Sequence, residues 1–299
     1  MTNSSSMTAL VSAFARAFHQ TDSPVRAFSD PAIAALLSPE EQRQIAASML
    51  AGKAYFLGEA FSGSDEEALR RIVNGHLAPS PLGRSAWAEE ALLRAVKTGG
   101  AKQYVLLGAG YDTFSMRLPA WAKGLTIFEV DLPQTQADKR RRMERTGQNL
   151  PETLRFVPAD LRAHDWTDAL LQAGYSPRQP AFFSALGLSY YLSGEEFFGL
   201  LKAIFGLLCP GGAVAFDYPA AQGEASRQEA LAAAAGEPMR AAYSAEALCA
   251  LLSEAGFLLY EDLSPEEIAA RYFAAYNAVH PDAPLLALPS ARFALAVRR

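Results

Sequence analysis

Two patterns of hydrophobic and polar positions divide this chain near residue 100. Before that point, apolar residues recur at the spacing of amphipathic helices. The segments that show it are Ala9–Phe18, Pro31–Leu37, Glu40–Ala60, Glu66–Val73 and Ser85–Lys97. Pro79, Pro81 and Gly83 are expected to break the pattern ahead of the last helix. The first 100 residues are therefore predicted to be helical.

From residue 101 onward, short apolar runs alternate with helical segments. The expected strands are Tyr104–Leu107, Thr126–Val130, Leu154–Val157, Ala181–Ala185 and Ala213–Phe216. The expected helices between them are Thr135–Arg145, Thr167–Ala173 and Gly194–Leu208. Nearly continuous apolar strands that alternate with helices indicate a parallel sheet covered on both faces.

The end of the chain departs from this alternation. A helix over Ala245–Ala255 is ended by Gly256, and the stretch Pro265–Tyr276 separates two further apolar runs, Phe257–Tyr260 and Phe293–Val297. We therefore predict an α/β fold with a seven-stranded, mostly parallel, doubly wound sheet. Residues 1–100 are expected to form a helical lid or substrate region, and residues 101–299 a cofactor-binding core. Ligands of such sheets bind at the carboxyl ends of the strands.

Composition and charge narrow the class of protein. The chain has 299 residues, 50% hydrophobic and 20% charged, which is typical of a globular protein. No apolar segment reaches the roughly 18 residues that span a bilayer, and the start lacks a secretory signal pattern. Cys209 and Cys249 are expected to be buried, and their spacing is not that of a metal site. We predict a cytoplasmic protein without a metal or a membrane partner.

The net charge of −5 argues against a nucleic-acid partner. One basic run, Lys139–Arg142, lies inside a helical pattern, and we expect it to form a solvated helix face. Small molecules are therefore the expected ligands.

Two neighbouring apolar runs end in residues that suit a nucleoside ligand. The first ends in Gly108-Ala109-Gly110, and the second ends in Asp131. Glycines let a ligand approach the backbone, and a carboxylate can accept both hydroxyls of a ribose. The third glycine of a dinucleotide fingerprint is missing, because Gly110 is followed by Tyr-Asp-Thr. A ligand without phosphates, such as S-adenosylmethionine, fits this pattern better than NAD.

Three further strand ends are expected to face the same crevice. Asp160-Leu161 can accept an adenine amino group and pack on its ring, while Leu186–Tyr191 and Asp217-Tyr218 follow the next two strands. Each feature also has a structural interpretation, since glycines make tight turns and tyrosines fill cores. We interpret Asp112 and Asp165 as helix caps. The succession of Gly-x-Gly, acid and acid at consecutive strand ends favours a ligand site.

Longer motifs carry a resemblance to a known family. They are Leu106–Leu118, Phe128–Pro133, Val157–Leu161, Arg16-Ala17, Asp30-Pro31 and Arg84 ahead of Glu89. The chain resembles class I S-adenosylmethionine-dependent methyltransferases of the leucine carboxyl methyltransferase type. It is more similar to their bacterial relatives, which O-methylate polyketide-like carboxylic acids. The likeness covers nearly the whole chain.

The resemblance implies roles for individual residues. Arg84 would pair with the methionine carboxylate, Gly108 would line the methionine moiety, Asp131 would hold the ribose, and Asp160 with Leu161 would hold the adenine. The full set of predicted cofactor-binding residues is Arg84, Gly108, Ala109, Gly110, Asp131, Leu132, Asp160, Leu161, Ala185 and Leu186. Leu186 departs from the family, which has a glutamate there, so the substrate side is the least defined part of the site.

We predict methyl transfer to the carboxylate of a small-molecule acid of secondary metabolism. Such a carboxylate is ionised at neutral pH, because free carboxyl groups titrate near about 4. No general base is then required, and we assign no catalytic residue. The candidates for orienting the acceptor are Ser189, Tyr190, Tyr191 and Tyr218. The helical residues 1–100 are expected to exclude water.

Three alternatives stay open. An oxygen, nitrogen or carbon acceptor that is not a carboxylate would benefit from a base, for which His76 is the only candidate. A nicotinamide-dependent oxidoreductase would need the missing third glycine. A protein that binds the cofactor without catalysis is compatible with Leu186.

Overall fold

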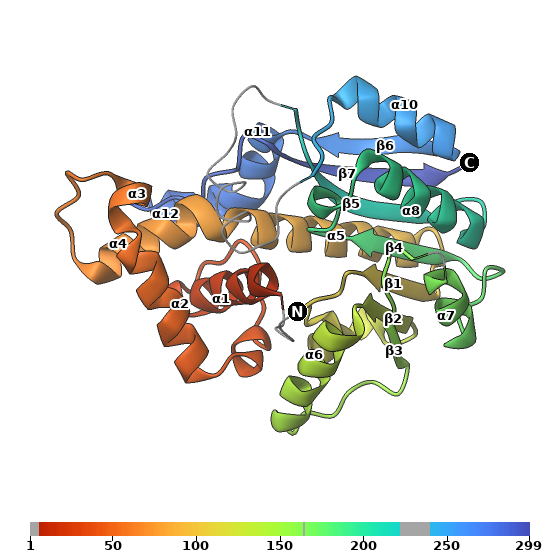
Figure 1. Ribbon diagram of the computed structural model, residues 1–299, viewed down its shortest axis with the longest axis horizontal. Helices are drawn as coiled ribbons and strands as arrows, with labels where there is room; N and C mark the ends of the chain where they lie inside the picture. The colour runs from red at the N-terminus through yellow and green to blue at the C-terminus, as the bar shows by residue number, and fades with distance from the viewer. Residues whose placement is uncertain (1–5, 164, 222–239) are drawn as a thin grey trace.

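The computed structural model describes residues 6–163, 165–221 and 240–299. Helical turns make up the chain before the first strand, as predicted. They are α1 (Met7–Asp22), η1 (Ile33–Leu36), α2 (Pro39–Ala51), α3 (Lys53–Leu57), α4 (Asp65–Ile72), η2 (Val73–Leu77) and α5 (Pro79–Lys97). The long helix α5 runs from this helical group to the sheet (Figure 1).

Seven strands form one sheet in the order β3-β2-β1-β4-β5-β7-β6. Their bounds are β1 (Gln103–Leu107), β2 (Thr126–Asp131), β3 (Leu154–Pro158), β4 (Ala181–Ala185), β5 (Ala213–Pro219), β6 (Phe257–Leu263) and β7 (Ala291–Arg298). Strands β1 to β5 are parallel, and β7 is antiparallel to both β5 and β6. The predicted seven-stranded, mostly parallel sheet is therefore confirmed. The strand order reverses beside β1, so the switch point of the sheet, where such sheets bind ligands in a crevice, lies at the carboxyl ends of β1 and β4.

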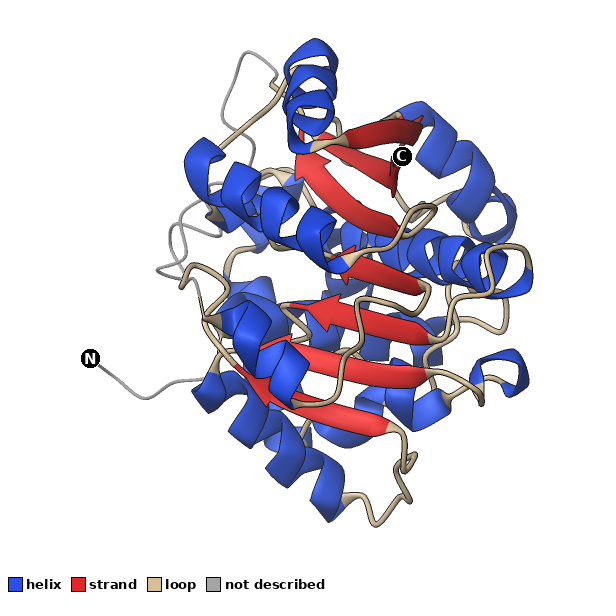
Figure 2. Cartoon of the chain, turned by 90° about the vertical axis from the view of Figure 1, so that its right-hand side faces the viewer, coloured by secondary structure: helices blue, strands red, loops and turns tan. Residues whose placement is uncertain are grey.

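Helices cover both faces of the sheet (Figure 2). Val105 and Leu107 of β1 belong to a core cluster with α8 (Gly194–Leu207) and α10 (Ala245–Ala255), whereas Tyr104 and Leu106 belong to another cluster with α1 and α5. Successive strand residues point to opposite faces, so the two clusters make two layers. The remaining helical elements are η3 (Phe114–Arg117), η4 (Ala120–Ala122), α6 (Pro133–Arg145), α7 (Trp166–Gln172), η5 (Ser189–Tyr191), α11 (Pro265–Ile268), η6 (Ala269–Phe273) and α12 (Ala274–Val279).

The expected break before Ser85 is wrong, because α5 begins at Pro79 and continues through Gly83. Proline is tolerated in the first turn of a helix, where its missing N–H has no partner to lose. A Cβ atom on Gly83 would lie 3.1 Å from the Phe273 ring, so the glycine lets η6 pack closely on the helix. Arg84 consequently lies near the start of a long helix.

The basic run Lys139–Arg142 is only half solvated, which corrects the prediction. Arg141 is exposed, whereas Lys139 and Arg142 are buried on the inward side of α6. The Lys139 ammonium lies 2.7 Å from the Glu129 carboxylate, itself buried in β2. Residues three apart share a helix face, so both ends of the run lie on the buried side of α6 and the two residues between them face solvent.

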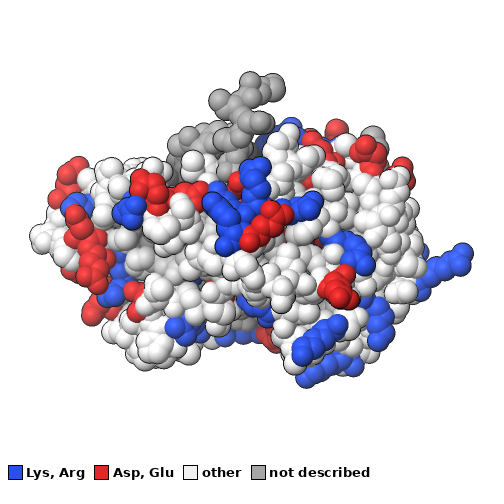
Figure 3. All heavy atoms as spheres, turned by 90° about the horizontal axis from the view of Figure 1, so that it is seen from below, with Lys and Arg blue, Asp and Glu red and all other residues white. Residues whose placement is uncertain are grey.

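Surface features bear on the predicted partners. Basic and acidic side chains are interspersed over the face seen in Figure 3. No helix within the described ranges has the length and apolar character needed to cross a bilayer. Cys209 is half-buried and Cys249 is exposed, so the expectation that both are buried is wrong.

Residues near the end of the chain also pack on the helical region. The Asn74 side-chain amide in η2 donates hydrogen bonds to the Tyr276 hydroxyl at 2.9 Å and to the Ala283 carbonyl at 2.8 Å. Residues between β6 and β7 therefore pack on the helices that precede β1. The division into residues 1–100 and 101–299 stays a prediction.

Candidate functional site

The loop after β1 is held by the end of β2. Gly108 and Gly110 both have positive φ values, 67° and 45°, which glycine adopts without strain. One carboxylate oxygen of Asp131 accepts the Gly110 amide at 2.5 Å, and the other accepts the Leu132 amide at 2.7 Å. A carboxylate can accept about four hydrogen bonds. Asp131 therefore fixes the loop and keeps acceptor capacity for a ligand.

Burial raises the pKa of Asp131. Desolvation of its carboxyl group causes this rise in pKa, and the amides of Gly110 and Leu132 oppose it. The residue is half-buried at the carboxyl end of its strand. Hydroxyl donors of a ligand would meet a carboxylate that is preorganised and poorly hydrated, which strengthens hydrogen bonds to it.

The loop after β4 is held in the same way by β5. Gly187 has a φ of 68°, and its amide donates to Asp217 at 2.5 Å. The second carboxylate oxygen of Asp217 accepts a hydrogen bond from Arg84 at 3.0 Å. The Ser189 hydroxyl donates to the Asp217 main-chain carbonyl at 2.7 Å. Two acidic residues thus fix two glycine-containing loops on the two sides of the switch point.

Arg84 is the basic group beside the Gly187 loop. Burial lowers its pKa, but Asp217, Tyr190 and Tyr191 together raise it, and the pKa lies above its usual value. Its side chain is 19% exposed, whereas that of Asp217 is fully buried. A Cβ atom on Gly187 would lie 2.5 Å from the Arg84 guanidinium, so only glycine leaves room for this side chain.

The predicted adenine contacts lie at the end of β3. Asp160 accepts two hydrogen bonds from the Arg162 guanidinium, at 3.0 and 2.8 Å, and one from the Arg162 amide at 3.0 Å, and these lower the pKa of its carboxyl group. The Ala159 amide donates to the Asp131 carbonyl at 2.9 Å, which brings Asp160 beside the ribose candidate. Leu161 is half-buried and Leu132 is 40% exposed.

The predicted acceptor-orienting residues separate into two groups. Ser189, Tyr190 and Tyr191 form the short helix η5, which is separated from Gly187 by Leu188 alone. Tyr218 follows Asp217 in β5 and points to the opposite face of the sheet. Its hydroxyl donates to Asp262 at 3.1 Å and accepts from Arg292 at 3.0 Å.

Tyr190 is a buried tyrosine of η5. Burial raises its pKa well above the usual value, and the nearby Asp217 carboxylate raises it further. Its hydroxyl forms no hydrogen bond within 3.5 Å among residues 6–163, 165–221 and 240–299. The group therefore stays protonated and can donate a hydrogen bond.

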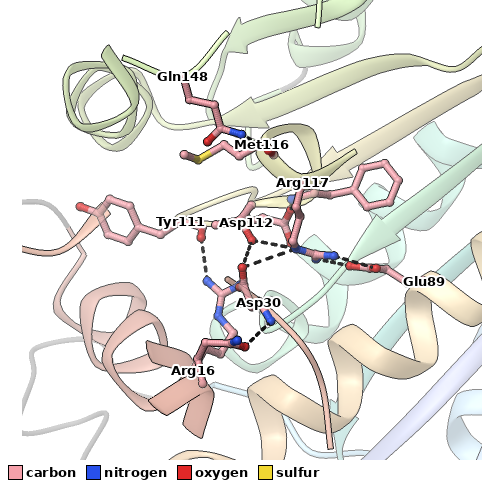
Figure 4. Close-up of polar contacts among 11 residues, drawn as sticks. Arg16, Asp30, Glu89, Tyr111, Asp112, Met116, Arg117 and Gln148 are labelled. Carbon is pink, nitrogen blue, oxygen red and sulfur yellow. Dashed lines mark hydrogen bonds and ion pairs between the residues drawn. The ribbon is translucent and has the colours of Figure 1, made fainter. Parts of the chain in front are cut away.

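An ion-pair network ties the N-terminal helices to the loop after β1 (Figure 4). Arg16 of α1 donates to the Asp30 carboxylate at 2.9 Å and to the Tyr111 carbonyl at 2.6 Å. Asp30 also accepts the Thr113 hydroxyl at 2.6 Å. A Cβ atom on Gly110 would lie 3.7 Å from the Ala9 side chain. Helix α1 therefore lies over the glycine loop.

Arg117 extends this network to α5. Its guanidinium pairs with both oxygens of Glu89, and its Nε donates to the Thr113 hydroxyl at 3.1 Å. Asp112 accepts the amide of Phe114, the first residue of η3, at 2.7 Å, from the position before the N-cap, which is Thr113. Asp165 precedes α7 without a capping hydrogen bond from its side chain, so its predicted capping role is wrong.

Sequence reasoning missed the roles of Asp217, Asp30 and Glu89. Asp217 directly follows the apolar run Ala213–Phe216. A charged residue that continues a buried strand was a usable signal, because an isolated buried acid requires a partner. The partner itself could not be read, since Arg84 lies 133 positions away.

The geometry agrees with comparisons to known proteins. The model of the family "Leucine carboxyl methyltransferase" matches residues 9–205. This chain belongs to that family. Over 282 residues it is 36% identical to YktD of Bacillus subtilis (strain 168), covering 91% of this chain and 92% of that protein. The name of YktD assigns it provisionally to the S-adenosyl-L-methionine-dependent methyltransferases.

Solved structures support the fold of this family member. One from Thermobifida fusca YX, described provisionally as a methyltransferase, gives a TM-score of 0.57 at 14% identity over 84% of this chain and 94% of that chain. A DUF574 family protein from Streptomyces avermitilis gives 0.56 at 16% identity over 85% and 97%. At this identity the likeness concerns the fold alone.

Proposed function

We propose that this protein transfers a methyl group from S-adenosylmethionine to the carboxylate of a small-molecule acid. Family membership and the name of YktD support the broader statement, that it is an S-adenosylmethionine-dependent methyltransferase. The observation that carries the proposal is the paired arrangement of Asp131 and Arg84 on the two sides of the switch point. It offers acceptors for ribose hydroxyls on one side and donors for an anion on the other.

The residues present fit this cofactor. Positive φ values at Gly108 and Gly110 let the backbone approach a ligand, and Asp131 keeps acceptor capacity for two hydroxyls. Asp160 and Leu161 are proposed to hold the adenine, and Arg84 the amino-acid end. When bound, the cofactor supplies an electrophilic methyl group on a sulfonium. The protein then has to align the acceptor and exclude water, for which α1 is suitably placed over Gly110.

The charges around η5 suit an anionic acceptor. Leu186 is apolar, and the nearby Asp217 carboxylate is buried and paired with Arg84. A carboxylate acceptor would therefore meet little repulsion on this side. Tyr190 stays protonated, because burial raises its pKa, and it can donate a hydrogen bond that orients the acceptor. A base is not needed for a group that is already ionised.

The histidines give little support to a reaction that needs a base. His19 is buried among the helices and its Nε2 accepts the Ala27 amide, while burial lowers its pKa to about 4. His76 lies in η2 and packs on Phe56 at 5.2 Å between ring centroids. His164 lies outside the described residues. A carboxylate acceptor remains the proposal that these groups support best.

The test is transfer of a labelled methyl group from S-adenosylmethionine to a panel of aliphatic, aromatic and polyketide-like acids. Label in an ester, released as methanol by mild alkali, is the expected result. The primary amides of the same acids are matched controls, since they keep the shape but lack the ionised oxygen. Label in a product stable to alkali would contradict the carboxylate proposal and favour a hydroxyl, nitrogen or carbon acceptor.

Two other results would replace the proposal. Binding of S-adenosylhomocysteine without transfer to any acceptor or cell extract would indicate a non-catalytic binding protein. Thermal stabilisation by NAD, but not by S-adenosylhomocysteine, would indicate an oxidoreductase. Cytoplasmic localisation, a role in secondary metabolism and a small molecule as the only partner are parts of the same proposal.

A further inference from the structure

We infer that Asp217 is a positioning residue for the amino-acid end of the cofactor, acting through Arg84. The inference rests on the proposed role of Arg84 and adds the residue that makes that role possible. Asp217 does not touch the ligand in this account, because its side chain is fully buried. It sets where the guanidinium and the Gly187 loop lie before the ligand binds.

The first argument is the division of hydrogen bonds at the Arg84–Asp217 pair. Asp217 uses one oxygen for the Gly187 amide at 2.5 Å and the other for Arg84 at 3.0 Å. A guanidinium has five N–H donors. Within the part of the chain that the structure describes, Asp217 is the one hydrogen-bond partner recorded for Arg84. The remaining donors are available to a carboxylate of the ligand.

The second argument is steric. The guanidinium passes over Gly187 at a distance where a Cβ atom would approach its Nη1 to 2.5 Å and its Nη2 to 2.7 Å. Gly187 has a φ of 68°, so the loop is both shaped for glycine and held by Asp217. One carboxylate therefore fixes the arginine and the surface on which it rests.

The third argument concerns solvent. Asp217 lies in the interior and Arg84 is 19% exposed, so the pair spans the boundary between core and crevice. If the arginine side chain were free to move, it would lose conformational entropy on binding an anion. Holding it from behind with a buried acid reduces that cost, because the geometry exists before the ligand arrives. The Ser189 hydroxyl, which donates to the Asp217 carbonyl, fixes the strand end as well.

The experiment compares two ligands by calorimetry on the full-length protein. S-adenosylhomocysteine has the amino-acid group, whereas 5′-methylthioadenosine has the same nucleoside and sulfur without it. Asp217→Asn should weaken S-adenosylhomocysteine about tenfold or more, as expected for a hydrogen bond to a charged group. Binding of 5′-methylthioadenosine should change less than about twofold, since the nucleoside half is untouched. A merely structural role would weaken both ligands together.

Two further variants make the comparison specific. Arg84→Gln should show the same selective loss, and Asp217→Asn added to Arg84→Gln should cause no further loss, because Asp217 acts through the arginine. Asp262→Asn is the matched control, since Asp262 forms a similar ion pair with Arg292, at 2.9 Å, on the opposite face of the sheet. It should leave the affinity ratio of the two ligands unchanged.

Each outcome decides something. Equal losses for both ligands in Asp217→Asn, or an unchanged affinity for S-adenosylhomocysteine, would overturn the inference. If Arg84→Gln also binds S-adenosylhomocysteine normally, the proposed role of Arg84 fails as well. Should Asp217→Asn not fold, Asp217→Glu carries the test. It keeps the charge but displaces the carboxylate by one methylene, and the same selective loss is expected.

Discussion

The two halves of the crevice use the same local device and present opposite charges. On the β1–β2 side, Asp131 holds the Gly110 amide; on the β4–β5 side, Asp217 holds the Gly187 amide, at the same distance of 2.5 Å. Asp131 remains half-buried and open to a ligand. Asp217 is fully buried, so that on this side the group available to a ligand is Arg84.

One local arrangement therefore gives two subsites of different charge. An acid in the neighbouring strand fixes a loop whose glycine has a positive φ, and burial then decides the charge of the subsite. Where the acid stays accessible, the subsite accepts hydrogen bonds; where a helix supplies an arginine above it, the subsite donates them. The halves also differ in support, because only the first is tied to α1 by the Arg16–Asp30 network.

Breaking that support should give the largest effect on stability. Asp30→Asn leaves Arg16 buried without its counter-charge, so we expect a loss of about 3–5 kcal/mol in the free energy of unfolding. Denaturant titration measures it. Asp65→Asn is the control, because the Lys53–Asp65 ion pair is exposed and should contribute less than about 1 kcal/mol. Equal effects of the two substitutions would contradict the assigned role of the network.

Crowding the second half should give an intermediate effect. Gly187→Ala adds a side chain at a left-handed φ and against Arg84, whereas Gly211→Ala adds one at a φ of 82° in open space. Both should lose about 1–2 kcal/mol of stability from backbone strain. Only Gly187→Ala should also weaken S-adenosylhomocysteine, by about tenfold for one lost charged hydrogen bond. Equal affinities for this ligand in the two variants would show that Arg84 does not use the space over Gly187.

The smallest effect concerns pH and the Glu41–Arg142 ion pair, which joins α2 to α6. A hydrogen bond from Arg142 lowers the pKa of Glu41 from 4.5 to about 2. A depressed pKa contributes stability above the unfolded value, and that contribution is lost as the pH falls towards the folded value. The stability advantage of the native protein over Glu41→Gln should therefore shrink as the pH is lowered from about 5 to about 2.

Urea unfolding at several pH values measures this difference. Glu40→Gln is the matched control, because the Arg43–Glu40 ion pair is exposed and should contribute little at any pH. If the stability advantage of the native protein over Glu41→Gln stayed constant across the acid range, it would contradict this role of the Glu41–Arg142 ion pair.

The strands and the first half of the site could be predicted from sequence because their signals are local. Each buried strand is a nearly continuous apolar run, and Asp131 follows the glycine loop by a fixed interval. The helix start at Pro79 was missed because prolines in a first turn look like breakers. Lys139 was misread because its partner, Glu129, lies in the middle of β2. The Arg84–Asp217 pair joins residues 133 positions apart, and no local pattern encodes such a contact.

The most direct test of the central claim is calorimetric binding of S-adenosylhomocysteine and 5′-methylthioadenosine to the native protein and to Asp131→Asn. The account predicts that the native protein binds both ligands. The substitution should weaken both by the same factor, about tenfold or more, because Asp131 serves the nucleoside that the two ligands share. Absence of binding to the native protein, or unchanged affinity for both ligands in Asp131→Asn, would contradict it.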